Sequence, residues 1–298
     1  MAGDVKAMKV AFLGTGLMGL PMAQRLLDAN IEIIAYNRTP EKLAPFRTAG
    51  VEIAEHPHEA IAACDCVILM LTNAAAIRSV LLSESSRQQL TGRTIIQMGT
   101  ITPTESKAIA EELIDAGGNY LEAPVLGSIP EAQAGKLIVM VGGTPEQFER
   151  WSELLQHFGS EPLLIGSVGS AAAVKLALNQ LIASLSTAFA LSLGFVQRQG
   201  IDVEVFMQIL RNSALYAPTF DKKLQRMCDR NYSNPNFPTK HLLKDTDLFI
   251  TEAQSTGLNI SSIEGVRKIL EVAVNKGLAE DDYSSLFSAI NPEELENN

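Results

Sequence analysis

GSVGSAAAVKLALNQLIASLSTAFALSLGFVQRQG, residues 166–200, is the stretch around which the rest of the chain is organised. Residues 170–199 contain no Pro and only one Gly, Gly194, and they are dominated by Ala and Leu, both strong helix formers. The stretch therefore predicts one helix of about thirty residues, roughly 45 Å long. Because it is apolar on nearly every side, we expect it to be buried, as the spine of a second domain or at a subunit interface.

Lys175 is the one charged residue in the first two turns of this helix, and Asn179 follows four residues later on the same face. An unpaired ammonium is costly to bury, so a lysine in an apolar helix points to a catalytic role. The alternative is a lysine whose side chain carries its charge to solvent near a helix end. The helix by itself is compatible with both interpretations.

The composition is that of a globular chain: 298 residues, 46% hydrophobic and 19% charged, long enough for two domains. The formal net charge of −10 argues against a nucleic-acid-binding protein, which would carry a basic patch. Three Cys and four His lack the spacing of metal ligands, so we expect no metal site. We see no signal-peptide pattern, and polar residues interrupt the long helix, so we expect a cytoplasmic protein that spans no membrane.

A glycine motif follows the first predicted strand, Lys9–Leu13. It reads Gly14-Thr15-Gly16-Leu17-Met18-Gly19 and runs into a predicted helix that ends near Ala29. Strand, GxGxxG and helix in this order are typical of a dinucleotide-binding site. The first glycine permits a tight turn, the second lets the backbone approach a pyrophosphate, and the third lets helix and strand pack closely. The alternative is a glycine-rich turn that binds no ligand.

The second predicted strand, Ile31–Tyr36, ends at Asn37-Arg38-Thr39. Sites specific for NAD usually place Asp or Glu here, on the ribose 2′-hydroxyl. A guanidinium instead suits a 2′-phosphate, so we predict that the chain binds NADP(H) rather than NAD(H). The alternative is a solvated arginine that caps the next helix, Pro40–Ala49.

Strands and helices continue to alternate as far as residue 165, which predicts an α/β fold with a Rossmann-type doubly wound parallel sheet. An all-helical second domain follows, joined by the long helix, and we place the domains at residues 1–168 and 169–298. Residues 291–298 are expected to form a frayed tail. Ligands bind at the carboxyl ends of parallel strands, so we expect one cofactor groove lined by Gly14–Met18, Asn37–Thr39, Leu71-Thr72-Asn73 and Gly99-Thr100.

A further loop, residues 124–128, separates two predicted strands. Gly127 and Ser128 offer backbone N–H groups and a hydroxyl, which together can form a nest for a carboxylate. An ordinary connection between two strands is the alternative.

Four motifs in order along the chain resemble those of the β-hydroxyacid dehydrogenases. That family includes 3-hydroxyisobutyrate dehydrogenase, tartronate semialdehyde reductase and glyoxylate/succinic semialdehyde reductase. The resemblance covers essentially the whole chain. The motifs are GTGLMGLPMAQRLL (14–27), EAPVLGSIPEAQAGKL (122–137), GSVGSAAAVKLALNQ (166–180) and FPTKHLLKDTDLF (237–249).

The resemblance implies roles for matching positions. Lys175 would be the general acid/base acting on the substrate carbonyl or hydroxyl, and Asn179 would help to hold the substrate. The loop Leu126, Gly127 and Ser128 would bind the substrate carboxylate.

The resemblance also implies roles in the fourth motif and at the cofactor. Lys244 would reach the cofactor, Asp245 would support the site and Phe237 would close it. Thr100 would contact the ribose or nicotinamide side of the cofactor. Asn-Arg-Thr is the pattern of NADP-preferring members, and GSIP (127–130) is closer to the glyoxylate/succinic semialdehyde branch.

Two positions depart from the family pattern. Leu126 stands where the loop normally has a serine, so one hydroxyl donor to the carboxylate is lost and apolar bulk is gained. Gly99 replaces the serine that usually precedes the residue matching Thr100. We expect both changes to leave the fold and the hydride chemistry intact.

We therefore expect an NADPH-dependent reductase that acts on a small-molecule carboxylate such as glyoxylate or succinic semialdehyde, assembled as a homodimer or homotetramer. One alternative is a 3-hydroxyisobutyrate-type dehydrogenase that works in the oxidative direction. Imine reductases share the first motif but generally lack the lysine at position 175. The other class of alternative is a catalytically inactive nucleotide-binding module.

Overall fold

The computed structural model of this chain describes residues 9–293. The chain forms two compact units, and the division between them falls in the sequence between Lys175 and Leu176. The predictions for the first eight residues and for residues 294–298 lie outside the described range. The structural division falls a few residues after the predicted domain boundary at 168/169, inside the long helix. The domain boundary itself stays a prediction.

The first unit contains a sheet in which β3, β2, β1, β4, β5, β6, β8 and β7 are neighbours in this order, with β9 paired to β8. The strands are β1 (Lys9–Leu13), β2 (Glu32–Tyr36), β3 (Glu52–Ile53), β4 (Cys66–Leu69), β5 (Thr94–Gln97), β6 (Asn119–Glu122), β7 (Val125–Leu126), β8 (Ile138–Gly142) and β9 (Leu163–Gly166).

Every pair from β3 to β6 is parallel, and β8 then runs antiparallel to both β6 and β7. The order reverses direction between β1 and β4, which is the switch point where doubly wound sheets bind their ligands. The predicted Rossmann-type fold class is confirmed.

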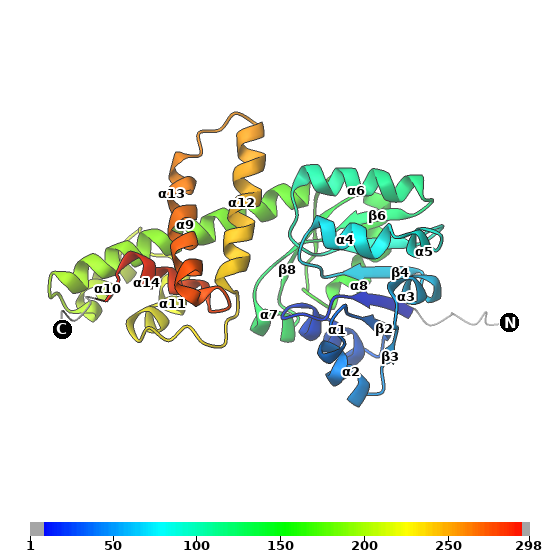
Figure 1. The fold of residues 1–298 in the computed structure, drawn as a ribbon, viewed down its shortest axis with the longest axis horizontal. Helices are drawn as coiled ribbons and strands as arrows, with labels where there is room; N and C mark the ends of the chain where they lie inside the picture. The colour runs from blue at the N-terminus through cyan, green and yellow to red at the C-terminus, as the bar shows by residue number, and fades with distance from the viewer. Residues whose placement is uncertain (1–8, 294–298) are drawn as a thin grey trace. The chain divides into compact units, whose positions relative to one another are not determined.

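Helices cover both faces of this sheet. Because side chains alternate along a strand, Phe12 lies in a core with α1, α2 and α8, whereas the adjacent Leu13 lies in a second core with α3, α4 and α6. In Figure 1, α4 and α6 lie together on one side of the sheet, and α1 and α2 lie on the other. The helices of this unit are α1 (Gly19–Asp28), η1 (Pro40–Leu43), α2 (Ala44–Thr48), α3 (Pro57–Ala63), α4 (Ala74–Leu81), α5 (Glu84–Arg87), α6 (Pro103–Asp115), α7 (Ile129–Gln133) and α8 (Pro145–Gln156).

Among its described residues, the regular elements of the second unit are helices, as predicted. Its core includes the stacked rings of Phe189 and Phe220, with ring centroids 4.7 Å apart. The helices α12 and α13 form a hairpin that is visible in Figure 1. The helices are α9 (Ser170–Arg198, which begins in the first unit), α10 (Val203–Arg211), α11 (Pro218–Cys228), α12 (Thr239–Ser255), α13 (Ser261–Ala273), η2 (Val274–Leu278), η3 (Tyr283–Ser285) and α14 (Leu286–Ile290).

One predicted helix differs in form: Pro40–Ala49 is a 3₁₀ turn followed by a short α-helix. In the second unit, α13 is followed directly by the π-helical turn η2, inside which Gly277 adopts a left-handed φ of 85°.

The helix α9 is long and apolar, as the sequence predicts. By length and composition alone it meets the criteria for a helix that crosses a membrane, and it is the one helix among residues 9–293 that does so. Within the structure, 44% of its apolar 18-residue window is buried. The core helix of a soluble protein meets the same criteria, so the prediction that α9 spans no membrane stays a prediction.

Candidate functional site

The glycine loop between β1 and α1 has the shape that a dinucleotide site requires. Gly14 has φ of 104°, and a Cβ there would overlap the backbone carbonyl of Met70. A Cβ on Gly19 would overlap the carbonyl of Gly14, whereas a Cβ on Gly16 would meet no atom within 4 Å. The outer glycines thus permit close packing, and the middle one leaves open space for a ligand.

The N-terminus of α1 lies directly after this loop. No side chain caps it: Met18, the N-cap residue, makes no side-chain cap hydrogen bond. The first backbone N–H groups of a helix have no partner within the helix, and together with the helix dipole they favour a phosphate group. Thr15 and Met18 face inward, and Leu17 is 48% exposed. The loop and this helix end fit a pyrophosphate.

Asn37 joins the glycine loop to the end of β2. Its Oδ1 accepts the backbone N–H of Thr15 at 3.0 Å, and its Nδ2 donates to the backbone oxygen of Thr39 at 2.9 Å. The hydroxyl of Thr15 also donates to the backbone oxygen of Lys42 at 3.3 Å. Asn37 was predicted to bind the cofactor. Both the oxygen and the nitrogen of its amide make hydrogen bonds within the chain.

Arg38 is exposed at the end of β2 and makes no ion pair or hydrogen bond with any residue in the described range. Lys42, on η1 four residues later, is exposed as well. The structure thus presents two cations beside the glycine loop. Only Arg38 was predicted from the sequence, although Lys42 follows it by four residues, within η1.

The loops after β4 and β5 approach each other closely. A Cβ on Gly99 would overlap the backbone oxygen of Leu71, so a serine at position 99 does not fit without movement of that loop. The side chain of Gln97 closes the loop by accepting the N–H of Gly99 and donating to its carbonyl. The departure from the family pattern at Gly99 thus has a packing reason.

Three polar residues of these two loops were predicted to bind the cofactor: Thr72, Asn73 and Thr100. Asn73 caps α4 by accepting the N–H of Ala76 at 2.8 Å, a role that the cofactor prediction did not include. Thr72 is exposed and Thr100 is half-buried. Taken together, the glycine loop, the free helix end and the exposed cations fit a nicotinamide dinucleotide.

Ser128 in the predicted carboxylate loop is bonded to a carboxylate of its own chain. Glu131 accepts the backbone N–H of Ser128 at 2.8 Å and its hydroxyl at 2.5 Å. Leu126 is half-buried at the end of β7, and Gly127 is exposed with φ of 136°. Glu131 was not among the predicted site residues, although Ser-x-x-Glu is the spacing of a helix capping box.

Lys175 is buried, with 9% of its surface exposed, one and a half turns into α9. It belongs to the same compact unit as the glycine loop. This low exposure argues against the alternative interpretation, in which the side chain carries its charge to solvent.

Asn179 lies on α9 in the second unit, one turn after Lys175 and on the same face of the helix. Its Nδ2 donates to Oδ2 of Asp245 at 2.6 Å, and Asp245 is 3% exposed. A carboxylate only accepts, so this bond fixes which end of the amide faces Asp245. Within the described residues Oδ1 of Asn179 is buried without a partner, which leaves an oriented acceptor for a ligand donor.

Lys244 is paired with Asp245, at 2.8 Å from Nζ to Oδ1. Asp245 therefore holds Asn179 on one oxygen and Lys244 on the other. The supporting role that the family resemblance implies for Asp245 stays a prediction.

Phe237 lies just before α12 and is half-buried. Its ring packs in an edge-to-face arrangement with the ring of Tyr283, with the ring centroids 5.8 Å apart, and its backbone oxygen accepts the N–H of Tyr283 at 3.0 Å. Asp282, next to Tyr283, binds the ammonium of Lys223 through both oxygens at 2.8 Å. Burial lowers the pKa of Lys223, against the attraction of Asp282, which raises it.

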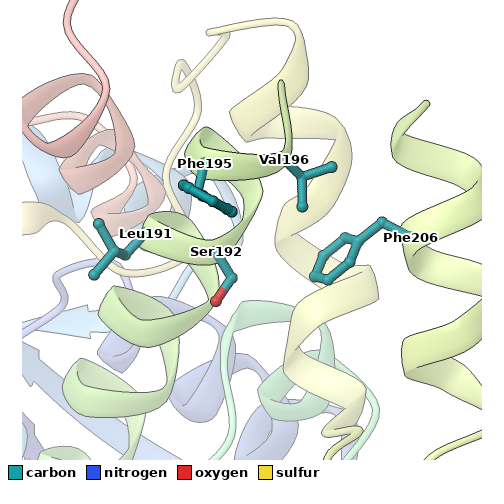
Figure 2. Close-up of a pocket in the computed structure, with 5 residues that line it drawn as sticks. All are labelled: Leu191, Ser192, Phe195, Val196 and Phe206. Carbon is teal, nitrogen blue, oxygen red and sulfur yellow. The ribbon is translucent and has the colours of Figure 1, made fainter. Parts of the chain in front are cut away.

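An apolar hollow of the second unit is separate from these residues. Figure 2 shows its lining, which comes from α9 and α10 and includes one polar side chain and no charged one: Leu191, Ser192, Phe195, Val196 and Phe206. Such a lining has no acidic or basic side chain that could serve as a proton donor or base at neutral pH. Among residues 9–293 no group of three or more His, Cys, Asp or Glu is arranged to hold a metal ion.

Two protein families match consecutive parts of the chain, which together cover residues 9–290. The family described as the NAD binding domain of 6-phosphogluconate dehydrogenase matches residues 9–169. The family described as NAD-binding of NADP-dependent 3-hydroxyisobutyrate dehydrogenase matches residues 169–290.

Among characterised relatives, glyoxylate/succinic semialdehyde reductase 1 of Arabidopsis thaliana is 30% identical over 285 residues, which cover 95% of this chain and 98% of the relative. The 2-hydroxy-3-oxopropionate reductase of Escherichia coli K12 is 30% identical over 288 residues, with 95% and 97% covered. Mitochondrial 3-hydroxyisobutyrate dehydrogenase of Mus musculus is 31% identical over 296 residues, with 96% and 88% covered.

Solved structures share the fold. The 3-hydroxyisobutyrate dehydrogenase of Mycobacterium tuberculosis with L-serine gives a TM-score of 0.86 at 22% identity, covering 95% of this chain and 99% of that one. Psf3 in complex with NADP+ and 2-OPP gives 0.82 at 21% identity, covering 94% and 99%. Both family matches and the relatives that align over almost their whole length agree with the residues described above. This chain belongs to the β-hydroxyacid dehydrogenase family of nicotinamide-dependent oxidoreductases.

Proposed function

We propose that this protein reduces small aldehyde acids, such as glyoxylate or succinic semialdehyde, with NADPH. The observation that carries the proposal is the buried Lys175 on α9, in the unit whose glycine loop fits a dinucleotide. The relatives at 30% identity named as reductases of such acids support it. Lysines that serve only solubility are exposed, so the burial of Lys175 indicates another role.

The chemistry requires a hydride at the carbonyl carbon and a proton at the carbonyl oxygen. NADPH, when bound, supplies the hydride. The ammonium of Lys175 donates the proton to the oxygen as negative charge develops there, which gives the alcohol and leaves a neutral amine. Oδ1 of Asn179 only accepts, so it could take the hydroxyl of the alcohol product, whereas the aldehyde acid offers it no donor.

The choice of NADPH rests on Arg38 and Lys42. Both side chains are exposed beside the glycine loop, and neither has an acidic partner within residues 9–293. A 2′-phosphate between them would gain two charge-assisted contacts, while a ribose 2′-hydroxyl would find no carboxylate acceptor there.

The substrate carboxylate is proposed to bind at the loop of Leu126, Gly127 and Ser128. The bond between Ser128 and Glu131 leaves the backbone at Gly127 as the exposed part of this loop. A carboxylate that binds there lies near the negative charge of Glu131. The repulsion weakens the binding of the substrate carboxylate, so the affinity for the substrate depends on the rest of the site.

The second candidate is oxidation of a 3-hydroxyisobutyrate-type acid with NADP+. The half-buried Leu126 favours it, because an apolar side chain at the carboxylate loop suits a methyl-bearing carbon chain. In this direction neutral Lys175 would accept the hydroxyl proton.

We also propose that two or more copies assemble through the second unit. Large apolar side chains on α9 and α10 are widely exposed: Leu191 at 62%, Phe195 at 63% and Ile209 at 67%. Leu191 and Phe195 also line the hollow in Figure 2, and large exposed apolar patches on soluble proteins often mark contacts with other protein chains. A second copy of the same helices would cover it, and sedimentation velocity would report the stoichiometry.

The function is tested by NADPH consumption with a panel of substrates. The panel contains glyoxylate, succinic semialdehyde, uncharged aldehydes of similar length, and cyclic imines, with 3-hydroxyisobutyrate and NADP+ for the reverse reaction. We expect the highest kcat/KM for an aldehyde acid. Faster oxidation of 3-hydroxyisobutyrate would support the second candidate, and tight NADPH binding with no turnover of any compound would show a nucleotide-binding module instead.

A further inference from the structure

Glu122 is a completely buried acidic residue that no part of the proposed chemistry uses. It is the last residue of β6 and is 0% exposed. Acidic side chains are rarely buried to this degree unless their oxygens are fully bonded. The hydrogen-bond partners of its two oxygens therefore indicate the role of this carboxylate.

One oxygen of Glu122 binds the start of α9. Oε1 accepts the backbone N–H groups of Gly169, Ala171 and Ala172 at 2.8, 2.9 and 3.2 Å. These N–H groups belong to the first turn, where helix donors have no partner within the helix. The carboxylate satisfies them from another segment of the chain, 47 to 50 residues away in sequence.

The space around the carboxylate is shaped to admit it. Gly142 of β8 pairs with Glu122 across the sheet, and a Cβ on Gly142 would overlap Oε1. The hydroxyl of the buried Ser106 donates to Oε2 and also lies 2.8 Å from the phenol oxygen of Tyr120. The carboxylate is thus held on both oxygens in a site that a larger residue at position 142 would close.

The two segments that Glu122 joins both carry proposed site residues. Four residues after Glu122 the loop of Leu126, Gly127 and Ser128 begins. Three residues after Ala172 comes Lys175, a little less than one helical turn further along α9. All of these residues lie in the first compact unit, so the connection does not depend on the placement of the second.

We propose that Glu122 is a positioning residue for the reduction: it fixes the first turn of α9, and so the backbone of Lys175, relative to the substrate-carboxylate loop. The proposal rests on the proposed function. The reason for a dedicated anchor is that proton transfer and hydride transfer must act on one carbonyl group at the same time. A misplacement of about 1 Å is enough to lower the rate by about a hundredfold.

The test compares three substitutions with a matched control. Glu122→Ala removes the acceptor, Glu122→Gln keeps an oxygen in the same place, and Gly142→Ala displaces the carboxylate without changing it. Thr144→Ala is the control, because Thr144 caps α8 of the same unit through the N–H of Gln147 and lies in no proposed site. For each variant kcat, KM and the Kd for NADPH are measured, with amide hydrogen exchange of residues 169–175.

We expect Glu122→Ala and Gly142→Ala to lower kcat by about a hundredfold, with the Kd for NADPH within about twofold of the unaltered value. Hydrogen exchange of residues 169–175 should accelerate in both. Glu122→Gln should keep kcat within about fivefold, since its amide oxygen still accepts the three N–H groups. Thr144→Ala should lower Tm without a change in kcat.

A kcat for Glu122→Ala that equals the unaltered value, with faster exchange at residues 169–175, would show an anchor without a positioning role. An equal loss of kcat in Thr144→Ala would show that the effect is general destabilisation, and would overturn the proposal too. No turnover by the unaltered protein would overturn the proposed function together with this proposal.

Discussion

The carboxylate of Glu131 accepts both the backbone N–H and the hydroxyl of Ser128, at 2.8 and 2.5 Å. The loop proposed for the substrate carboxylate thus already holds a carboxylate of its own chain. Two negative charges near 4 Å apart repel by about 1 kcal/mol in water, which corresponds to about fivefold in affinity.

Glu131→Gln should therefore lower the KM for glyoxylate or succinic semialdehyde by about fivefold. The KM for an uncharged aldehyde should not change, because only a carboxylate meets the charge of Glu131. Steady-state kinetics on both substrates measure this, with Glu146→Gln on the exposed start of α8 as the control for net charge. An equal change for the uncharged aldehyde would exclude repulsion as the cause.

Cofactor preference depends on Arg38 in this account. Arg38→Asp should raise the KM for NADPH by about tenfold to a hundredfold, since a hydrogen bond to a charged group contributes about 1.5–3 kcal/mol. The KM for NADH should change little. Arg87→Asp, at the exposed end of α5, makes the same change in net charge away from the site. Equal effects on NADPH and NADH would remove Arg38 from the 2′-phosphate site.

The buried pair of Lys223 and Asp282 should contribute strongly to stability. Asp282 is 0% exposed, and Lys223 also lies over the ring of Tyr283 at 4.2 Å. Lys223→Met leaves the Asp282 charge buried without its partner, which should cost about 3–5 kcal/mol of the free energy of unfolding. Urea denaturation of Lys223→Met measures the loss.

The double variant Lys223→Met with Asp282→Asn provides the comparison for that loss. An amide at position 282 carries no charge, so the double variant should recover part of the stability. A loss below about 1 kcal/mol in Lys223→Met would instead indicate that the pair is solvated, as surface pairs are.

Glu122 should give a distinct dependence of stability on pH. Burial raises its pKa above the ordinary value, against the hydrogen bonds from Ser106 and the first turn of α9, which lower it. As pH rises past about 4.3, the unfolded chain therefore releases its proton before the folded one, and folding loses stability by up to about 1.4 kcal/mol per pH unit until the folded group also ionises.

Glu122→Gln has no proton to release at this position. The stability of this variant relative to the unaltered protein should therefore increase as pH rises from about 4 and then level off above the folded pKa. Urea denaturation of both proteins across this range gives the difference directly. A difference that moves the opposite way would show that the hydrogen bonds outweigh burial and lower the pKa.

Much of the first unit could be predicted from its sequence because the signals are local. Gly14, Gly16 and Gly19 are required by a turn, an open approach and a close helix contact, and each requirement is met where expected. Alternating apolar strands and helices were sufficient for the doubly wound sheet. The short helices α5 and α7 were missed, because four or five residues give no periodic pattern.

The roles of polar side chains were harder to predict, because they depend on contacts distant in sequence. Asn37 was predicted to bind cofactor, yet its amide joins Thr15 to Thr39. Nothing near Glu122 in the sequence shows that its partners are at residues 169–172. The unpartnered Oδ1 of Asn179 likewise follows only from the bond to Asp245.

Lys175 is the residue on which the proposed chemistry depends most, and the direct measurement is single-turnover reduction of an aldehyde acid by Lys175→Ala with NADPH already bound. We predict a rate at least about a hundredfold below that of the unaltered protein, with unchanged affinity for NADPH, because the proton donor is lost while the cofactor loop is intact. A rate within about threefold of the unaltered protein would contradict proton donation by Lys175.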